Sequence, residues 1–591
     1  MWAPLAGRVE IEVSRAGRFP MVAEDDGWWS WEEAAGIRGM RPDGEGLDYA
    51  FVLDGAEPAL PDPRSPWQPH GVHGPSRTFD PTTFAWTDSG WPGPQGGEGA
   101  LGAVFYELHV GTFTPEGTLD AATTRLDHLV RLGVDVVELM PVAAFPGRWS
   151  WGYDGVGLWA VDDAYGGPLA LQRFVDACHG RGIGVCLDVV YNHLGPEGNY
   201  LARFGPYFTE DHQTPWGPAV NFDAAGSTEV RAFVVGAALR WFRDFHVDAL
   251  RLDAVHELHD ESEEHVLTEL AVAVDELAAA QGRPLALMAE SDLNDATTVT
   301  PVEEGGVGMT GQWDDDVHHA LHVTLTGETD AYYADFAASG ALAKTLSRAF
   351  FHDGTHSTFR GRRWGAPVDP EALDARRMMA YLQTHDQVGN RAVGDRITDT
   401  ITPGQQAIGA ALYLTSAFTP MVFMGEEWRA TSPFQFFTDF GDPGLQEAVK
   451  EGRRAEFATH GWPDDDVPDP QDETTRSRSV LRWDEVSRPG HAEMLSWYAA
   501  LIALRHKETD LRSGDLGAVR VAHDQDAGWL VMHRGGLATV VNLSPAGQVV
   551  PLGEVADVLL AWGEATVVPG APGIRLEGHD VAVVRMAGWA A

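Results

Sequence analysis

Strand-like segments that alternate with helix-like segments place the strongest constraint on the fold of this chain. From residue 103 onward, short apolar, β-branched runs recur. Most of the stretches between them carry apolar residues at three- and four-residue spacing, as in residues 227–246. This alternation predicts a parallel sheet that helices cover on both faces. Seven strands are predicted in this way, at 103–110, 134–142, 184–193, 247–255, 285–291, 378–386 and 418–427.

An eighth strand near "GQWDDDVHH" (311–319) would complete a closed (β/α)8 barrel. The predicted fold class is therefore α/β, with a TIM barrel as the catalytic domain. A doubly wound open sheet is the alternative, because it shows the same alternation of strands and helices. The two folds differ in whether the last strand pairs with the first.

The length of 591 residues exceeds what one hydrophobic core usually supports, so several domains are expected. Segments such as "RVEIEV" and "DYAFVLDG" predict an N-terminal β-sandwich domain at 1–88, and a Gly/Pro-rich linker follows at 89–100. Alternating strands return in a C-terminal β domain at 514–591. The barrel domain then spans 101–513, with a short insertion at 194–226 and a long loop at 426–490.

The composition limits the possible partners. A formal net charge of −45 repels nucleic acid and anionic membranes, so neither is an expected partner. The two cysteines, Cys178 and Cys186, are typical of a reducing compartment. The sequence has no signal-peptide pattern, no run of 18 apolar residues and no glycine-rich phosphate loop. We expect a cytoplasmic protein that uses no cofactor.

Polar side chains gather at the carboxyl ends of the predicted strands. These residues are Asp188, Asn192, His193, Arg251, Asp253, Glu290, His385 and Asp386. We expect the carboxylates Asp253, Glu290 and Asp386 to share one pocket with His193, Arg251 and His385. Each of them singly could be a structural ion-pair partner or a helix cap. In a barrel, however, these strand ends converge at one mouth, where active sites are built. A metal cluster is the other possibility, but the sequence has neither an HxH nor an HExxH spacing.

Acid–base chemistry favours a glycosidase. Retaining hydrolysis needs an ionised carboxylate nucleophile and a protonated carboxylic acid, roughly 5–5.5 Å apart. Arg251 is placed to keep Asp253 ionised, and a neighbouring negative charge would raise the pKa of Glu290. These opposite shifts are what the two roles require.

Four motifs resemble the signature regions of the α-amylase superfamily, glycoside hydrolase family 13: "DVVYNH" (188–193), "LRLDAVH" (250–256), "AES" (289–291) and "QTHDQ" (383–387). The resemblance spans roughly residues 100–510. It implies that Asp253 is the nucleophile, Glu290 the general acid/base and Asp386 the residue that stabilises the transition state. It also implies that Arg251, His193 and His385 hold the sugar in the cleavage subsite. This sugar would stack on the ring of Tyr153 in "WGYDG".

Further stretches, at 141–168, 195–209 and 424–428, resemble a subgroup that hydrolyses the α-1,4-glucosidic bond next to the terminal trehalose of maltooligosyl trehalose. The expected substrates are therefore maltooligosyl trehalose and related α-glucans. Glycogen branching or debranching on a similar scaffold is one alternative, and a non-catalytic carbohydrate-binding protein is another.

The loops at the predicted mouth supply additional candidates for substrate binding. Val255 stands before His256 where many amylases have Lys. This difference indicates that the part of the site that holds the leaving group is built from other residues than in those amylases. The segment 194–226 has only Glu197, Glu210, Asp211 and Asp223 as acids, so no calcium or other metal is expected. The other candidates are polar or aromatic residues of the rim: Trp313, Asp315, His318, Gln387 and Trp428, with Phe434, Phe436 and Phe437 as possible stacking walls.

Overall fold

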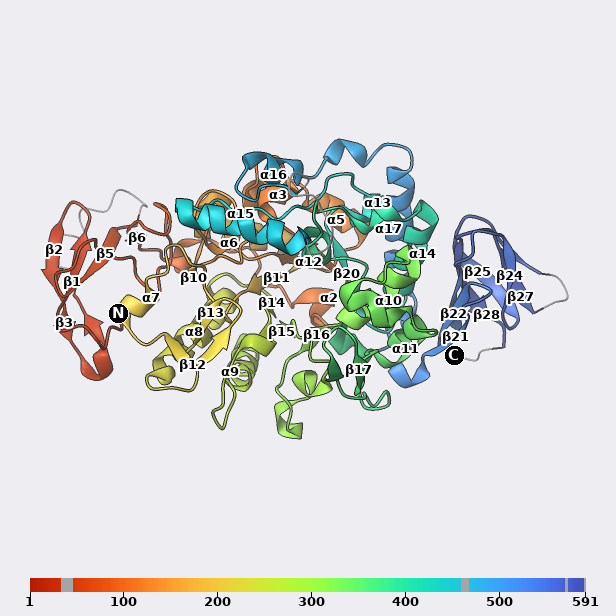
Figure 1. The fold of residues 1–591 in the computed structure, drawn as a ribbon, viewed down its shortest axis with the longest axis horizontal. Helices are drawn as coiled ribbons and strands as arrows, with labels where there is room; N and C mark the ends of the chain where they lie inside the picture. The colour runs from red at the N-terminus through yellow and green to blue at the C-terminus, as the bar shows by residue number, and fades with distance from the viewer. Residues whose placement is uncertain (33–45, 459–466, 569–571, 589–591) are drawn as a thin grey trace.

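The computed structural model describes residues 1–32, 46–458, 467–568 and 572–588. The molecule is elongated, with a small N-terminal sheet at one end, a large central barrel and a C-terminal pair of sheets at the other end (Figure 1). No helix of the described residues is long and apolar enough to cross a membrane.

Eight strands form the closed barrel, in the order β11-β14-β15-β16-β19-β20-β7-β8, and every pairing between neighbours is parallel. All seven predicted strands and the eighth near 311–319 are confirmed, and closure excludes the open sheet. The strands are β7 (Phe105–Leu108), β8 (Val136–Leu139), β11 (Gly184–Val189), β14 (Ala249–Leu252), β15 (Ala286–Ala289), β16 (Gly311–Trp313), β19 (Met378–Tyr381) and β20 (Thr419–Phe423).

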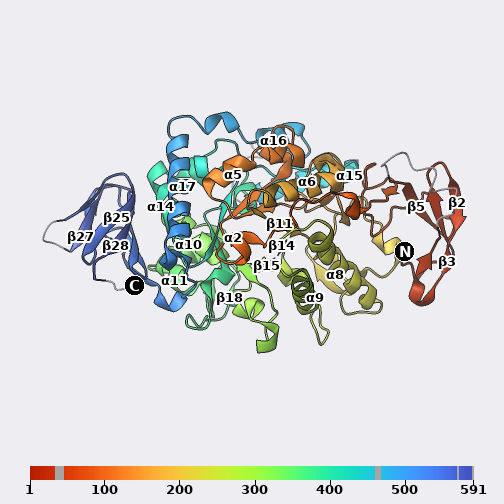
Figure 2. The same ribbon diagram turned by 180° about the vertical axis from the view of Figure 1, so that it is seen from behind.

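Helices surround the barrel on its outer side (Figures 1 and 2). The helix at Ser227–Asp244, α8, illustrates the cause: Val230, Phe233, Ala237 and Trp241 recur at helical spacing and all are buried. The main helices of this layer are α5 (Leu126–Leu132), α6 (Gly167–His179), α8, α9 (Val266–Gln281), α10 (Asp315–Thr326), α11 (Ala341–Arg348), α14 (Pro403–Leu414) and α17 (His491–Lys507).

The N-terminal sheet has the order β2-β1-β5-β6. Its strand β1 buries Val9, Ile11 and Val13, whereas the two glutamates between them are only half-buried, so one face packs and the other meets water. The strands are β1 (Val9–Val13), β2 (Gly17–Pro20), β5 (Asp48–Leu53) and β6 (Ser76–Arg77), with a separate ribbon of β3 (Val22–Ala23) and β4 (Trp29–Ser30).

The C-terminal part consists of a five-stranded sheet and a three-stranded sheet, which enclose their own apolar core. The strands of the larger sheet are β21 (Arg520–Asp524), β22 (Trp529–Arg534), β23 (Leu537–Asn542), β28 (Val581–Met586) and β25 (Val555–Trp562). The smaller sheet has β24 (Gln548–Pro551), β27 (Gly573–Leu576) and β26 (Ala565–Val567).

Insertions after several barrel strands build the surroundings of the mouth. They include the ribbon of β9 (Ala143–Ala144) and β10 (Gly157–Val161), the hairpin of β12 (Phe208–Thr214) and β13 (Gly217–Val220), the hairpin of β17 (Thr355–Ser357) and β18 (Arg362–Trp364), and the helices α12 (His385–Gly389) and α15 (Pro443–Ala458).

A buried carboxylate at the amino end of β14 joins the base of the barrel to the segment before it. Asp248 is 1% exposed and accepts four hydrogen bonds. Trp91 Nε1 and Arg283 Nη1 reach Oδ1 at 2.8 Å each, while His179 Nε2 at 3.0 Å and the Val185 backbone N–H at 2.9 Å reach Oδ2. Because a buried charge is tolerated only when it is paired and hydrogen-bonded, Asp248 has a structural role.

We predict that Asp248→Ala lowers the free energy of unfolding by about 3–5 kcal/mol, because it leaves buried cationic partners without their counter-charge. Urea titration followed by tryptophan fluorescence measures the change. The matched control is Asp120→Ala, which removes an ion pair with Arg173 whose side chains are about half exposed. The control should change stability by no more than about 1 kcal/mol. Equal stability of the two variants would contradict a structural role for Asp248.

Candidate active site

Arg251 occupies the centre of the carboxyl end of the barrel. Its guanidinium is fully buried, and Nη1 donates to both oxygens of Asp188 and to Asp253 Oδ1, each at 2.8 Å. Nη2 lies 2.7 Å from Glu290 Oε2 as an ion pair, without hydrogen-bond geometry. The guanidinium also lies 4.5 Å above the Trp313 ring. One cation therefore contacts three carboxylates from neighbouring strands.

The Asp253 carboxylate is held in its ionised form. Asn192 Nδ2 donates to Oδ2 at 2.8 Å, and Arg251 donates to Oδ1. Burial alone would raise the pKa of Asp253, but Arg251, Asn192 and His193 together lower it below the ordinary value. The side chain is 11% exposed, so a ligand at the mouth can reach it.

The Glu290 carboxyl has the opposite behaviour. Burial first, and then the charges of Asp253 and Asp386, raise the pKa of Glu290 well above its ordinary value, although Arg251 opposes the shift. Oε2 accepts the backbone N–H of Ala254 at 2.8 Å. Ala254 has φ 39°, a strained left-handed conformation for alanine that directs this N–H toward Glu290. Among the described residues, no hydrogen bond reaches Oε1, which is therefore free to carry the proton.

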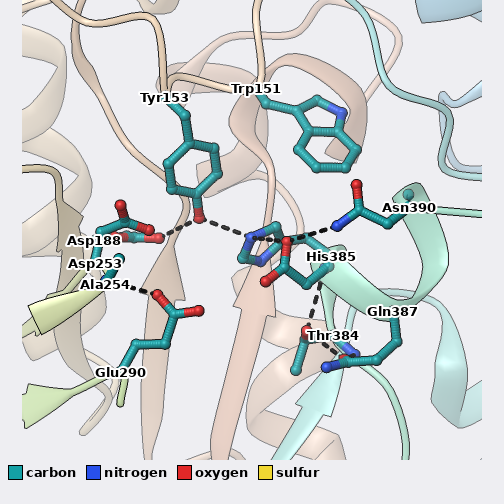
Figure 3. A network of polar contacts seen from close by, with 12 residues as sticks. Trp151, Tyr153, Asp188, Asp253, Ala254, Glu290, Thr384, His385, Gln387 and Asn390 are labelled. Carbon is teal, nitrogen blue, oxygen red and sulfur yellow. Dashed lines mark hydrogen bonds and ion pairs between the residues drawn. The ribbon is translucent and has the colours of Figure 1, made fainter. Parts of the chain in front are cut away.

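Asp386 is the second residue of the short helix α12 and is the most exposed of the three candidate carboxylates, at 38% of its side chain. Asn390 Nδ2 donates to Oδ1 at 3.2 Å, and His385 Nε2 lies 3.6 Å from the same oxygen. Figure 3 shows Tyr153 linked both to Asp188 and to the His385 ring. The structure thus gathers the predicted carboxylates and their basic partners in one network.

Aromatic rings border this network. Tyr153 stacks on His385 with centroids 5.2 Å apart, and Trp151 meets the same imidazole edge-on at 5.7 Å. His193 Nε2 donates to the Tyr153 carbonyl at 3.0 Å, and the Trp216 ring stacks on the imidazole at 4.1 Å and 8°. Trp216 lies at the turn of the β12–β13 hairpin and is 52% exposed, so one of its faces remains open to a ligand.

Three other predicted residues line the edge of the site. His256 follows Val255 after β14 and is half-buried. Asp315 begins α10 and accepts a hydrogen bond from Tyr381; burial raises the pKa of Asp315 to about 6. Gln387 caps α12, since its Oε1 accepts from the Thr384 backbone N–H at 2.9 Å.

The structure contradicts several predicted sugar contacts. Trp428 is 0% exposed and packs against His128 and Trp483, because the loop after β20 folds back on its own core. His318 is also fully buried and bonds the Leu382 carbonyl at 2.9 Å.

The same correction applies to other aromatic candidates. Phe434 and Phe437 are fully buried, and Phe434 supports Trp151 by stacking at 5.1 Å. Phe436 is only half-buried, with the guanidinium of Arg453 over its ring, so burial does not exclude it and its role stays a prediction. Trp313 is 2% exposed inside the barrel, so it supports Arg251 from below and cannot contact a sugar.

Two members of the network were not predicted from the sequence. Glu107 bonds His385 from β7, and Trp216 covers His193, but neither was predicted as a site residue. A charged residue within the apolar run "AVFYELHV" (103–110) was the available signal for Glu107, the same signal that pointed to Asp253. No comparable signal marked Trp216, whose position depends on the register of its hairpin.

The described residues contain no group of three or more His, Cys, Asp or Glu side chains that could hold a metal ion.

Comparisons with known proteins identify the family of the chain. Residues 79–214 match the family model "Alpha amylase, catalytic domain". The malto-oligosyltrehalose trehalohydrolase of Arthrobacter ramosus is 51% identical over 591 residues, which cover 99% of both chains. A crystal structure of a putative alpha amylase from Salmonella typhimurium has a TM-score of 0.89 at 36% identity and covers 99% of this chain and 97% of that one.

A branching enzyme matches much less of the chain. The 1,4-alpha-glucan branching enzyme of Vibrio parahaemolyticus is 38% identical over 257 residues, which are 40% of this chain and 33% of that enzyme. The relatives that match along the whole length, together with the carboxylate network on the barrel, show that the chain belongs to the malto-oligosyltrehalose trehalohydrolase family.

Proposed function

We propose that this protein hydrolyses the α-1,4-glucosidic bond next to the terminal trehalose of maltooligosyl trehalose and releases trehalose. The observation that carries the proposal is the opposed ionisation of Asp253 and Glu290 around Arg251. A retaining glycosidase needs this pair in these two states. The relative that matches along 99% of both chains, a trehalohydrolase, supports the choice of substrate.

In the proposed mechanism, Asp253 attacks the anomeric carbon while Glu290 donates its proton to the departing glycosidic oxygen. Arg251 and Asn192 hold the two Asp253 oxygens in place, so the nucleophile is oriented before substrate binds. Glu290, now ionised, then takes a proton from water, which attacks the covalent intermediate and regenerates both groups.

Asp386 and the rings around it hold the sugar in this proposal. The Asp386 carboxylate accepts hydrogen bonds from sugar hydroxyls. The sugar ring becomes positively charged in the transition state, and a nearby anion stabilises that charge. Tyr153 offers a stacking face at the same sugar, and the open face of Trp216 offers a second one at the rim.

The substrate class is tested with two substrates of equal length, maltooligosyl trehalose and the corresponding maltooligosaccharide. We predict that kcat/KM is at least about tenfold higher for the former, equal to about 1.4 kcal/mol of transition-state binding, with free trehalose as product. Equal rates would reject this specificity in favour of a general α-glucan hydrolase. New 1,6-linked branch points in the product would favour a branching enzyme.

The role of Glu290 is tested with Glu290→Gln. We predict a loss of about 10²–10⁴-fold in kcat on maltooligosyl trehalose, because the sugar leaving group needs a proton. The initial release of fluoride from an α-maltosyl fluoride should fall by less than about tenfold, because fluoride leaves without protonation. The control is Glu269→Gln, a surface glutamate of α9 that pairs with Arg231, and it should retain both activities. Equal losses on both substrates would contradict the acid role.

A further inference from the structure

A buried glutamate below the site accepts two hydrogen bonds from His385. Glu107 lies on β7 and is 1% exposed. Its Oε1 is 2.5 Å from His385 Nδ1, and its Oε2 accepts the His385 backbone N–H at 3.0 Å. The carboxylate therefore fixes both the ring and the main chain of one residue at the start of α12.

The second nitrogen of the His385 ring also faces an acceptor. The Tyr153 hydroxyl has a single hydrogen, which it donates to Asp188 Oδ2 at 2.6 Å. Its oxygen then accepts from His385 Nε2, which lies 2.8 Å away. With Nδ1 directed at Glu107, both ring nitrogens are placed to donate, and only the imidazolium has two N–H groups. The Asp386 carboxylate, 3.6 Å from Nε2, favours the same charged form.

The surrounding charges agree with this assignment. Burial alone would lower the pKa of His385, but Glu107 and Asp386 raise it to about 9. The charged and titratable groups that face His385 come from several segments: Glu107 on β7 with His109 just after it, Tyr153 before β10, Asp188 on β11, Arg251 on β14, and Asp386 on α12 itself.

The neighbouring strand β8 carries a second buried glutamate, which is mainly uncharged at neutral pH. Glu138 on β8 pairs in register with Glu107 and is 0% exposed. Burial, together with Glu107 and Asp188, raises the pKa of Glu138 to about 8, so it stays mainly protonated at neutral pH.

We propose that Glu107 is a positioning residue that keeps His385 doubly protonated and thereby holds Tyr153 and Asp386 in place for the sugar. The inference deepens the proposed function and rests on it. In a neutral His385 with its proton on Nδ1, Nε2 would carry a lone pair. That lone pair would face the oxygen of the Tyr153 hydroxyl, whose hydrogen is donated to Asp188, and it would also face the Asp386 carboxylate. Both groups would then move away from the ring.

The test compares the pH dependence of kcat in Glu107→Gln and wild type. We expect the variant to lose about tenfold or more at pH 8 but only about twofold at pH 5.5, where the higher proton concentration and the remaining Asp386 charge keep His385 protonated. Glu269→Gln, the surface glutamate of α9 that pairs with Arg231, is the control, and its activity relative to wild type should not vary with pH. A pH profile of Glu107→Gln parallel to wild type would overturn the proposal.

Titration of the His385 ring in the wild-type protein tests its charge state even if Glu107→Gln fails to fold. In wild-type protein with isotope-labelled histidine, the His385 signal is identified by its loss in His385→Gln and followed by NMR across pH. We expect the wild-type imidazole to remain charged at pH 8, and a midpoint near the ordinary value of about 6.5 would overturn the proposal. The titration needs no substrate, so failure of the proposed hydrolysis would leave this result standing on its own.

Discussion

The buried guanidinium of Arg251 is the interaction on which the active end of the barrel depends. It binds Asp188 and Asp253 through one nitrogen and faces Glu290 with another. Without these partners, a buried cation would cost several kcal/mol, and without the cation Asp188 and Asp253 could not share this space in ionised form. Because Arg251 bonds Asp253 directly, it stabilises the anion there, while Glu290 is left with burial and two nearby negative charges. One cation thus separates the two carboxyl groups into a nucleophile and an acid.

The parallel register of the barrel is what brings these groups together. Asp188 on β11 pairs in register with Arg251 on β14, and Glu290 directly follows β15, which pairs with β14 on its other side. The same short segment also carries Asp248 at the opposite end, where it bonds the base of the barrel. Charges within one apolar strand therefore serve two purposes, structural at the amino end and chemical at the carboxyl end.

Much of this arrangement could be predicted from the sequence, because strand periodicity and the position of polar residues at strand ends are local properties. The eight strands and the grouping of Asp253, Glu290 and Asp386 follow from those properties. The loop after β20 could not be predicted in the same way. Its aromatic residues indicate that they pack against an apolar surface, but not whether that surface belongs to a ligand or to the protein. In the structure, Trp428 and Phe434 pack into the loop's own core. Contacts across the barrel, such as Glu107 with His385, join residues 278 positions apart and have no local signal that pairs them.

The most direct test of the account is the site of covalent attachment. Glu290→Gln is incubated with α-maltosyl fluoride, which needs no proton to leave, while loss of the base slows hydrolysis of the intermediate. The protein is then digested and mapped by mass spectrometry. The account predicts a maltosyl ester on Asp253, the carboxylate that Arg251 and Asn192 hold ionised. A sugar attached to another residue, or consumption of the fluoride with inversion and no attachment, would contradict it.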